Sequence, residues 1–201
     1  MNITSRKFIG SFNKLNELPT TGTPEFCFIG RSNVGKSSLI NFITGKNDLA
    51  KVSSTPGKTQ SLNYFLLNNL WYLVDLPGYG YARRSKTLRS EWEKVMYRYF
   101  EERESLTNIF LLIDSRIKPM KSDLEMIDWL GENGVPFSLV YTKADTRELK
   151  QCKINIKIFE DKLSETWSEL PISFVTSSEE RRGKEEILNY IESCVNGLKE
   201  E

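Results

Sequence analysis

Short apolar runs alternate with longer amphipathic segments along most of this chain. The apolar runs are typical of strands, at 25–29, 61–67, 70–76, 108–114, 135–141 and 171–175. Apolar positions spaced three and four residues apart predict helices at 38–44, 88–104, 121–133, 146–167 and 184–198. Strands that alternate with helices predict an α/β domain with a mostly parallel sheet and helices on both faces.

Two parts of the chain depart from this alternation. The pair Asn68-Asn69 separates two adjacent strand-like runs and suits a tight turn, which predicts a hairpin and hence one antiparallel edge strand. Residues 1–23 form an N-terminal extension that ends in a turn-rich connector. Its apolar residues at 8, 9 and 12 predict a short edge strand or a cover for the sheet. Residues 24–201 are expected to form the main domain.

Composition limits the function classes. A chain of 201 residues fits one domain. Its net charge of +1 creates no overall electrostatic attraction to nucleic acid or membrane, so such contacts would need local charged patches. The absence of histidine excludes histidine-based catalysis and metal sites. The three cysteines, Cys27, Cys152 and Cys194, have no metal-binding spacing and predict reduced thiols. Without a signal peptide or a run of about 18 apolar residues, we expect a cytoplasmic protein that does not enter membranes.

A glycine-rich stretch lies between the first predicted strand of the main domain and the helix after it. It fits G-x-x-x-x-G-K-[ST], the P-loop pattern, with residues Gly30, Arg31, Ser32, Asn33, Val34, Gly35, Lys36 and Ser37. Backbone N–H groups of such a loop surround phosphates at the positive end of the helix. Lys36 would reach the β- and γ-phosphates, and the Ser37 hydroxyl would bind Mg²⁺. The alternative is a chance glycine-rich turn.

Two further stretches suit the phosphate end of a nucleotide. Thr59, in the polar loop at 45–60, could be a second Mg²⁺ ligand that becomes ordered with the γ-phosphate. An Asp-x-x-Gly stretch then ends a predicted strand, with residues Asp75, Leu76, Pro77 and Gly78. The Asp75 carboxylate would hold Mg²⁺ through water, and the Gly78 N–H would approach the γ-phosphate. We therefore expect Lys36, Thr59 and Gly78 to be the catalytic residues.

Two more stretches suit a guanine base. A [NT]-K-x-D pattern follows a buried strand, with residues Thr142, Lys143, Ala144 and Asp145. The Asp145 carboxylate can accept from guanine N1–H and the 2-amino group, a pair that adenine lacks, and the Lys143 stem could pack on the base. After the last strand, an N–H of Thr176, Ser177 or Ser178 could reach guanine O6, although a plain Ser/Thr turn before a helix is the alternative.

Together these motifs resemble the EngB/YsxC (YihA) family of Era-like, ribosome-biogenesis GTP-binding proteins, over about residues 24–198. The Pro-Gly-Lys-Thr-Gln stretch at 56–60 and the Pro-Gly-Tyr-Gly stretch at 77–80 are specific to that family. The resemblance implies a three-layer, small-GTPase-like P-loop NTPase domain that binds GTP and GDP with Mg²⁺. It also implies hydrolysis of GTP, a role in assembly of the large ribosomal subunit, and a link to division septum formation. It adds to the nucleotide site Gly57, Lys58, Gln60 and Ser61.

The position after the Asp-x-x-Gly stretch is unusual. Many GTPases have a water-orienting glutamine there, and this chain has Tyr79, so we expect slow intrinsic hydrolysis that a cation or a partner completes. In related GTPases an asparagine at the place of Asn33 helps to bind K⁺. The plain alternative for Asn33 is a turn residue that tolerates unusual backbone angles. Arg31 is among the nearest arginines, but none is an obvious internal arginine finger.

Basic residues flank these motifs and could contact RNA phosphates, although a solvated surface is the plain alternative. They are Arg83, Arg84, Lys86, Arg89, Arg181, Arg182 and Lys184. The leading hypothesis is a monomeric GTP-dependent switch that binds a large-subunit assembly intermediate, made of ribosomal RNA and proteins. The competing hypotheses are a P-loop phosphotransferase and a nucleotide-gated scaffold or septation protein with little hydrolysis.

Overall fold

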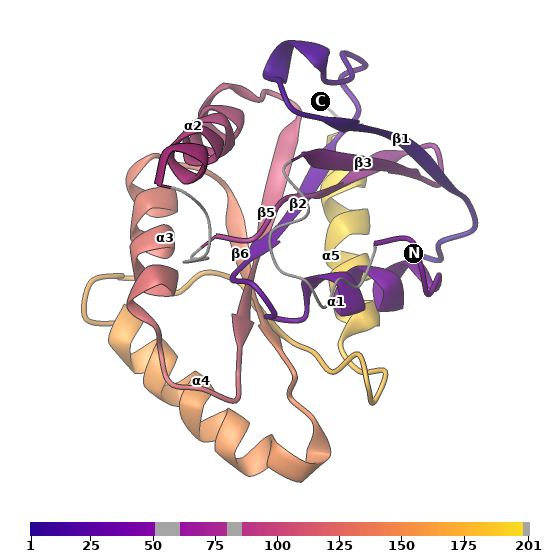
Figure 1. Ribbon diagram of the computed structural model, residues 1–201. Helices are drawn as coiled ribbons and strands as arrows, with labels where there is room; N and C mark the ends of the chain where they lie inside the picture. Colours follow the sequence, from indigo (N-terminus) through magenta and orange to yellow (C-terminus); the bar gives the residue numbers. More distant parts are fainter. Residues whose placement is uncertain (51–60, 80–85, 199–201) are drawn as a thin grey trace.

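The computed structural model describes residues 1–50, 61–79 and 86–198 (Figure 1). Its strands are β1 (Arg6–Phe12), β2 (Glu25–Gly30), β3 (Leu62–Leu67), β4 (Trp71–Asp75), β5 (Leu106–Asp114), β6 (Phe137–Thr142) and β7 (Ser173–Val175). Its helices are α1 (Lys36–Thr44), α2 (Lys86–Glu102), α3 (Lys121–Glu132), α4 (Leu149–Leu163) and α5 (Lys184–Gly197), with 3-10 turns at Leu15–Glu17 and Thr146–Glu148. None of these helices combines the length and apolar character needed to cross a membrane.

The described strands form one sheet in the order β1-β3-β4-β2-β5-β6-β7. The strands from β4 to β7 in this order run parallel, while β3 is antiparallel to β4 and β1 is antiparallel to β3. Asn68 and Asn69 have φ values of 53° and 54°, the left-handed pair that joins two strands in a tight hairpin. The mostly parallel sheet with an antiparallel pair at one edge is therefore confirmed. The outermost strand of that pair is β1, from the N-terminal extension.

The sheet lies between two layers of helices. Figure 1 shows α2, α3 and α4 on one face and α1 and α5 on the other. Each face has its own apolar core, with Tyr99, Ile127 and Phe159 in the first and Ile43 and Ile191 in the second. The expected three-layer α/β architecture is confirmed.

Strand β2 connects the two cores and leads into the P-loop. It is buried along its whole length, and its side chains alternate between the two faces of the sheet. Cys27 and Ile29 belong to the core beside α2, while Phe26 and Phe28 belong to the core beside α1. Because β2 is held on both faces, the loop at its carboxyl end starts from a fixed position.

The helix predicted at 146–167 is shorter at both ends than expected. Residues Thr146–Glu148 form a separate 3-10 turn, because the N–H and hydroxyl of Thr146 donate to Glu180 at 2.5 and 2.6 Å. The last residue of α4 is Leu163, and the hydroxyl of the next residue, Ser164, donates to the backbone oxygen of Glu160 at 2.9 Å. The N–H of Ser164 donates to the same oxygen at 2.9 Å, so this carbonyl accepts a backbone bond and a side-chain bond at the end of the helix.

The parallel strands all end at the same edge of the sheet, where ligands bind in folds of this type. The loops that follow β2, β4, β5, β6 and β7 therefore come together there. These are the loops that carry the motifs found in the sequence.

Candidate functional site

The P-loop connects β2 to α1, and two of its residues have left-handed backbone angles. Asn33 has a φ of 63° and Gly35 a φ of 104°, a conformation that glycine adopts freely and asparagine tolerates. Helix α1 starts at Lys36, which puts Ser37 in its first turn. The glycine-rich loop is thus followed directly by a helix N-terminus, the arrangement that favours anions.

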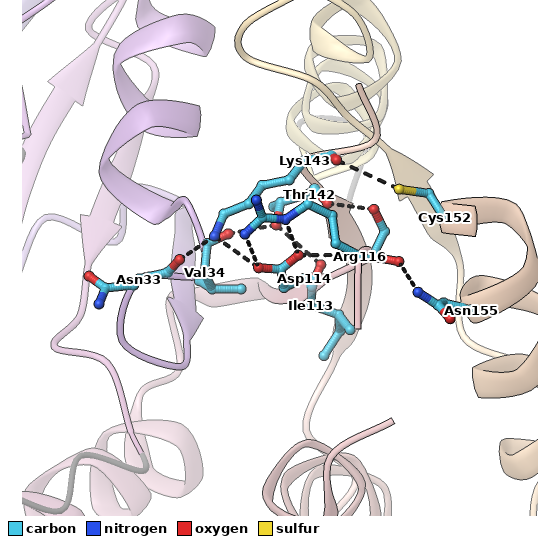
Figure 2. Close-up of polar contacts among 10 residues, drawn as sticks. Asn33, Val34, Ile113, Asp114, Arg116, Thr142, Lys143, Cys152 and Asn155 are labelled. Carbon is cyan, nitrogen blue, oxygen red and sulfur yellow. Dashed lines mark hydrogen bonds and ion pairs between the residues drawn. The ribbon is translucent and has the colours of Figure 1, made fainter. Parts of the chain in front are cut away.

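Residues at the end of β6 hold the P-loop from one side (Figure 2). The hydroxyl of Thr142 donates to the backbone oxygen of Val34 at 2.6 Å. The Nζ of Lys143 donates to the backbone oxygen of Asn33 and to Asp114 Oδ2, 2.9 Å away. The Thr142 hydroxyl and the Lys143 ammonium thus both hold the P-loop backbone in place.

Asp114 is a site residue that sequence reasoning missed. It ends β5, is 7% exposed, and accepts hydrogen bonds from the N–H, Nε and Nη2 of Arg116 at 3.1, 3.0 and 3.0 Å. Burial raises the pKa of Asp114, but the hydrogen bonds from Arg116 and Lys143 outweigh this effect and lower the pKa below its usual range. The signal in the sequence was an aspartate at the end of a buried strand that neighbours β6.

The Asp-x-x-Gly stretch lies against the P-loop. Lys36 Nζ pairs with Oδ1 of Asp75, the last residue of β4, so the phosphate-binding lysine and the Mg²⁺-binding carboxylate of the prediction meet at one place. A Cβ atom on Gly78 would lie 2.8 Å from the backbone oxygen of Gly30 and 3.2 Å from the backbone nitrogen of Ser32. Only glycine lets the chain pass this close to the P-loop backbone.

Arg31 and Tyr79 meet at a carboxylate of α3. Arg31 Nε lies 2.9 and 3.0 Å from the two oxygens of Asp123, and the Tyr79 hydroxyl donates to Asp123 Oδ1 at 2.8 Å. Asp123 is 1% exposed, and burial raises its pKa while the Tyr79 hydrogen bond and the Arg31 charge oppose that rise. The Arg31 guanidinium therefore pairs with α3, which gives it a role that the sequence did not predict.

The guanine-binding residues of the prediction also come together. Asp145 Oδ1 accepts a hydrogen bond from the hydroxyl of Ser177, which is fully buried. The Ala144 N–H donates to the backbone oxygen of Thr176 at 3.0 Å. The loops after β6 and β7 are thus joined through both backbone and side chains, with Ser178 half-buried beside them.

Two basic residues that were candidates for RNA contact have intramolecular partners. Arg182 Nη2 donates to the backbone oxygen of Ala144 at 2.5 Å and to Glu180 at 2.6 Å, so it joins the two loops that are predicted to bind the base. Lys184 lies 5.9 Å from the ring centroid of Phe42. Arg181 is exposed.

Several predicted site residues are not among the described ones. Outside the described part of the chain lie Gly57, Lys58, Thr59, Gln60, Arg83, Arg84 and the side chains of Lys86 and Arg89. Ser61 is described and lies just before β3. Within the described ranges no group of three or more acidic, cysteine or histidine residues could hold a metal ion. The Ser37 hydroxyl and the Asp75 carboxylate are still suitable for Mg²⁺, which prefers few protein oxygens and completes its shell with water and phosphates.

Comparisons with known proteins agree with this geometry. A family model described as "50S ribosome-binding GTPase" matches residues 25–143. The chain is 54% identical over 193 residues to a "Probable GTP-binding protein EngB" of Bacteroides fragilis, which covers 96% of each chain. It is 52% identical over 199 residues to the protein of the same description in Phocaeicola vulgatus, covering 99% of this chain and 100% of that one.

Solved structures show the same fold. A "probable GTP-binding protein engB" superposes with a TM-score of 0.69 at 21% identity, covering 86% of this chain and 99% of that chain. NFeoB from S. thermophilus, bound to GDP.AlF4- and K+, superposes with a TM-score of 0.60 at 27% identity. That match covers 84% of this chain and 60% of NFeoB.

Proposed function

This chain belongs to the EngB family of P-loop GTPases, and from that premise we propose that it is a GTP-dependent switch in assembly of the large ribosomal subunit. The observation that carries the proposal is the contact of Gly78 with the P-loop backbone. A γ-phosphate held by the P-loop would lie beside this segment, whereas GDP has none to offer. The description of the matching family model as a 50S ribosome-binding GTPase supports the ribosomal partner.

The nucleotide would bind along the shared edge of the parallel strands. Its guanine would meet Asp145, and its phosphates would meet the P-loop amides and Lys36, whose ammonium now pairs with Asp75. Ser37 and Thr59 would hold Mg²⁺, with Asp75 acting through water. The metal would supply positive charge that offsets the charge of the β- and γ-phosphates.

Hydrolysis by this site would be slow without a further group. The Tyr79 hydroxyl donates to Asp123, so this side chain is not placed to orient an attacking water. We infer that K⁺ near Asn33 or the ribosomal partner completes the site. The exposed side chain of Asn33 and the K⁺ in the NFeoB complex support the cation.

A switch requires that the partner binds the GTP and GDP states with different affinity. The test is sedimentation with purified large ribosomal subunits in GDP, in a non-hydrolysable GTP analogue and without nucleotide. We expect pelleting with the GTP analogue and little with GDP, and weaker pelleting at higher salt as RNA phosphates are contacted. The Lys36→Ala variant is the control, since its pelleting should not depend on the nucleotide.

Other outcomes point elsewhere. Equal pelleting in all three conditions would mean a ribosome binder without a switch. No pelleting in any condition would favour the nucleotide-gated scaffold, including a role in division septum formation. A hydrolysis rate that ribosomal subunits do not change would favour that scaffold as well.

A further inference from the structure

Three separate segments of the chain meet at the buried carboxylate of Asp123. They are the P-loop through Arg31, the residue after the Asp-x-x-Gly stretch through Tyr79, and the first turn of α3 through Asp123 itself. Arg31 and Tyr79 are separated from Asp123 by 92 and 44 positions in the sequence. A fully buried carboxylate with two partners from different loops fixes those loops relative to each other.

Tyr79 is held at both of its ends. Its backbone N–H donates to the backbone oxygen of Gly30 at 3.2 Å, and its hydroxyl donates to Asp123 at 2.8 Å. Its side chain is part of the core beside α2 and α3, and the residue is 8% exposed. Because Gly78 is the preceding residue, the place of the Gly78 N–H beside the P-loop depends on how Tyr79 is held.

Arg31 has a different part in the same cluster. Its guanidinium supplies the positive charge that a buried carboxylate requires, and the two oxygens of Asp123 lie 2.9 and 3.0 Å from its Nε. This pairing directs the arginine charge to α3. Loss of the pair would free a positive charge near the phosphates of GDP and of GTP alike, so it would act on both nucleotides in the same direction.

We propose that Asp123 is a positioning residue that raises the affinity of the site for GTP relative to its affinity for GDP. It does so by holding Tyr79, and with it Gly78, against the P-loop, where the Gly78 N–H can meet a γ-phosphate. GDP has no group at that place, so its affinity should not depend on the Tyr79 contact. The inference rests on the nucleotide site proposed above and is independent of the ribosomal partner.

The test compares two variants with a control from the same helix. Tyr79→Phe removes only the hydroxyl, and Asp123→Asn removes the carboxylate charge while keeping its shape. Glu125→Gln makes the same chemical change as Asp123→Asn on a side chain that is 63% exposed and pairs with Lys121 at 3.2 Å. For each protein, the affinities for fluorescent GDP and for a non-hydrolysable GTP analogue are measured by titration, and folding by urea denaturation without nucleotide.

We expect Tyr79→Phe to weaken the GTP analogue by about three- to tenfold and to leave GDP within about twofold, as for loss of one hydrogen bond to a charged group. Asp123→Asn should lower the affinity for the GTP analogue relative to that for GDP by a similar factor. It should also change the affinities for both nucleotides in the same direction, because the charge of Arg31 is no longer paired with Asp123. Glu125→Gln should match the wild type. The double variant should change the ratio of the two affinities no more than the larger single effect, because both changes act on the same contact.

The outcomes separate this inference from the proposed site. If Asp123→Asn and Tyr79→Phe lower the unfolding midpoint and leave the ratio of the two affinities unchanged, Asp123 has a purely structural role and the inference is wrong. If the wild type binds neither nucleotide, the proposed nucleotide site itself is wrong. A reduced ratio in Glu125→Gln would show that any change of charge on α3 has this effect, which also contradicts the assignment to Asp123.

Discussion

The reading of the base can be tested with Asp145→Asn. In the structure the Ser177 hydroxyl donates to Asp145 Oδ1, and the oxygen of that hydroxyl accepts the Glu180 N–H at 2.9 Å. A carboxylate can accept from Ser177 and also from both donors on guanine, N1–H and the 2-amino group. The amide of asparagine has one acceptor oxygen, so it cannot serve both sides.

The loss of GDP affinity follows from the two ways in which the amide of the new asparagine can be oriented. With its oxygen toward Ser177, its NH₂ group opposes the donors of guanine. With its oxygen toward guanine, its NH₂ group faces Ser177, and the Ser177 hydroxyl proton loses its acceptor. Each arrangement loses at least one hydrogen bond to a charged group and leaves one donor unpaired. We therefore expect the binding free energy of GDP to fall by about 3 kcal/mol, which is roughly a hundredfold weaker binding.

The same variant should bind xanthine nucleotides more tightly than the wild type does, because their 2-oxo group can accept a hydrogen bond from the new amide. The assay is competition of GDP and XDP against a fluorescent nucleotide, with Asp161→Asn on the exposed side of α4 as control. The control should retain wild-type selectivity. If Asp145→Asn still prefers GDP over XDP by the wild-type factor, Asp145 does not read the base, and the reasoning from Ser177 fails with it.

Three further changes test other parts of the site. Lys36→Ala should weaken fluorescent GDP binding by roughly a hundredfold with an unchanged far-ultraviolet circular dichroism spectrum, because charge-assisted bonds to the phosphates are lost; near wild-type affinity would reject the P-loop assignment. Hydrolysis should be faster in K⁺ than in Na⁺, and Asn33→Ala should abolish the difference; equal wild-type rates in both salts, free and bound to ribosomal subunits, would reject the cation. The lowered pKa of Asp114 means that its stabilisation is present above its unfolded-state pKa and is lost as pH falls through the folded-state pKa. Asp114→Asn should thus lower the free energy of unfolding at pH 7 by on the order of 1 kcal/mol, since Arg116 is 42% exposed and solvent screens the pair, with little effect in strong acid; equal losses by urea denaturation at both pH values would contradict this.

Local patterns were sufficient for the parts of the fold that neighbouring residues determine. The apolar run at β2, the glycine spacing after it and the apolar stripe of α1 predicted a strand, a loop and a helix, and the structure contains all three. The turn at Asn68-Asn69 was predictable because asparagine tolerates the left-handed angles that a tight hairpin requires. The 3-10 turn before α4 was not predictable, because it depends on the bonds of Thr146 to Glu180, which form only when distant parts of the chain have come together.

The partners of the site side chains were beyond sequence reasoning. Arg31 lies in the P-loop, and nothing near it in the chain indicates that its guanidinium binds Asp123, 92 positions away. Lys143 was expected to pack on the base, which stays a prediction; in the structure its ammonium binds Asn33 and Asp114. Both contacts depend on which strands neighbour each other in the sheet, and a periodic pattern along one segment contains no such information.

The bonds from Thr142 and Lys143 to the P-loop have a consequence for ligands smaller than a nucleotide. They attach the end of the strand that precedes Asp145, the residue predicted to read the base, to the loop that would hold the phosphates. Ordering one loop then reduces the entropy that remains to be lost when the other is ordered. Guanosine should bind more tightly in the presence of pyrophosphate, and pyrophosphate more tightly in the presence of guanosine, by the same factor. The affinity for an intact nucleotide would then come partly from a linkage within the protein, in addition to the ribose that joins the two halves of the ligand.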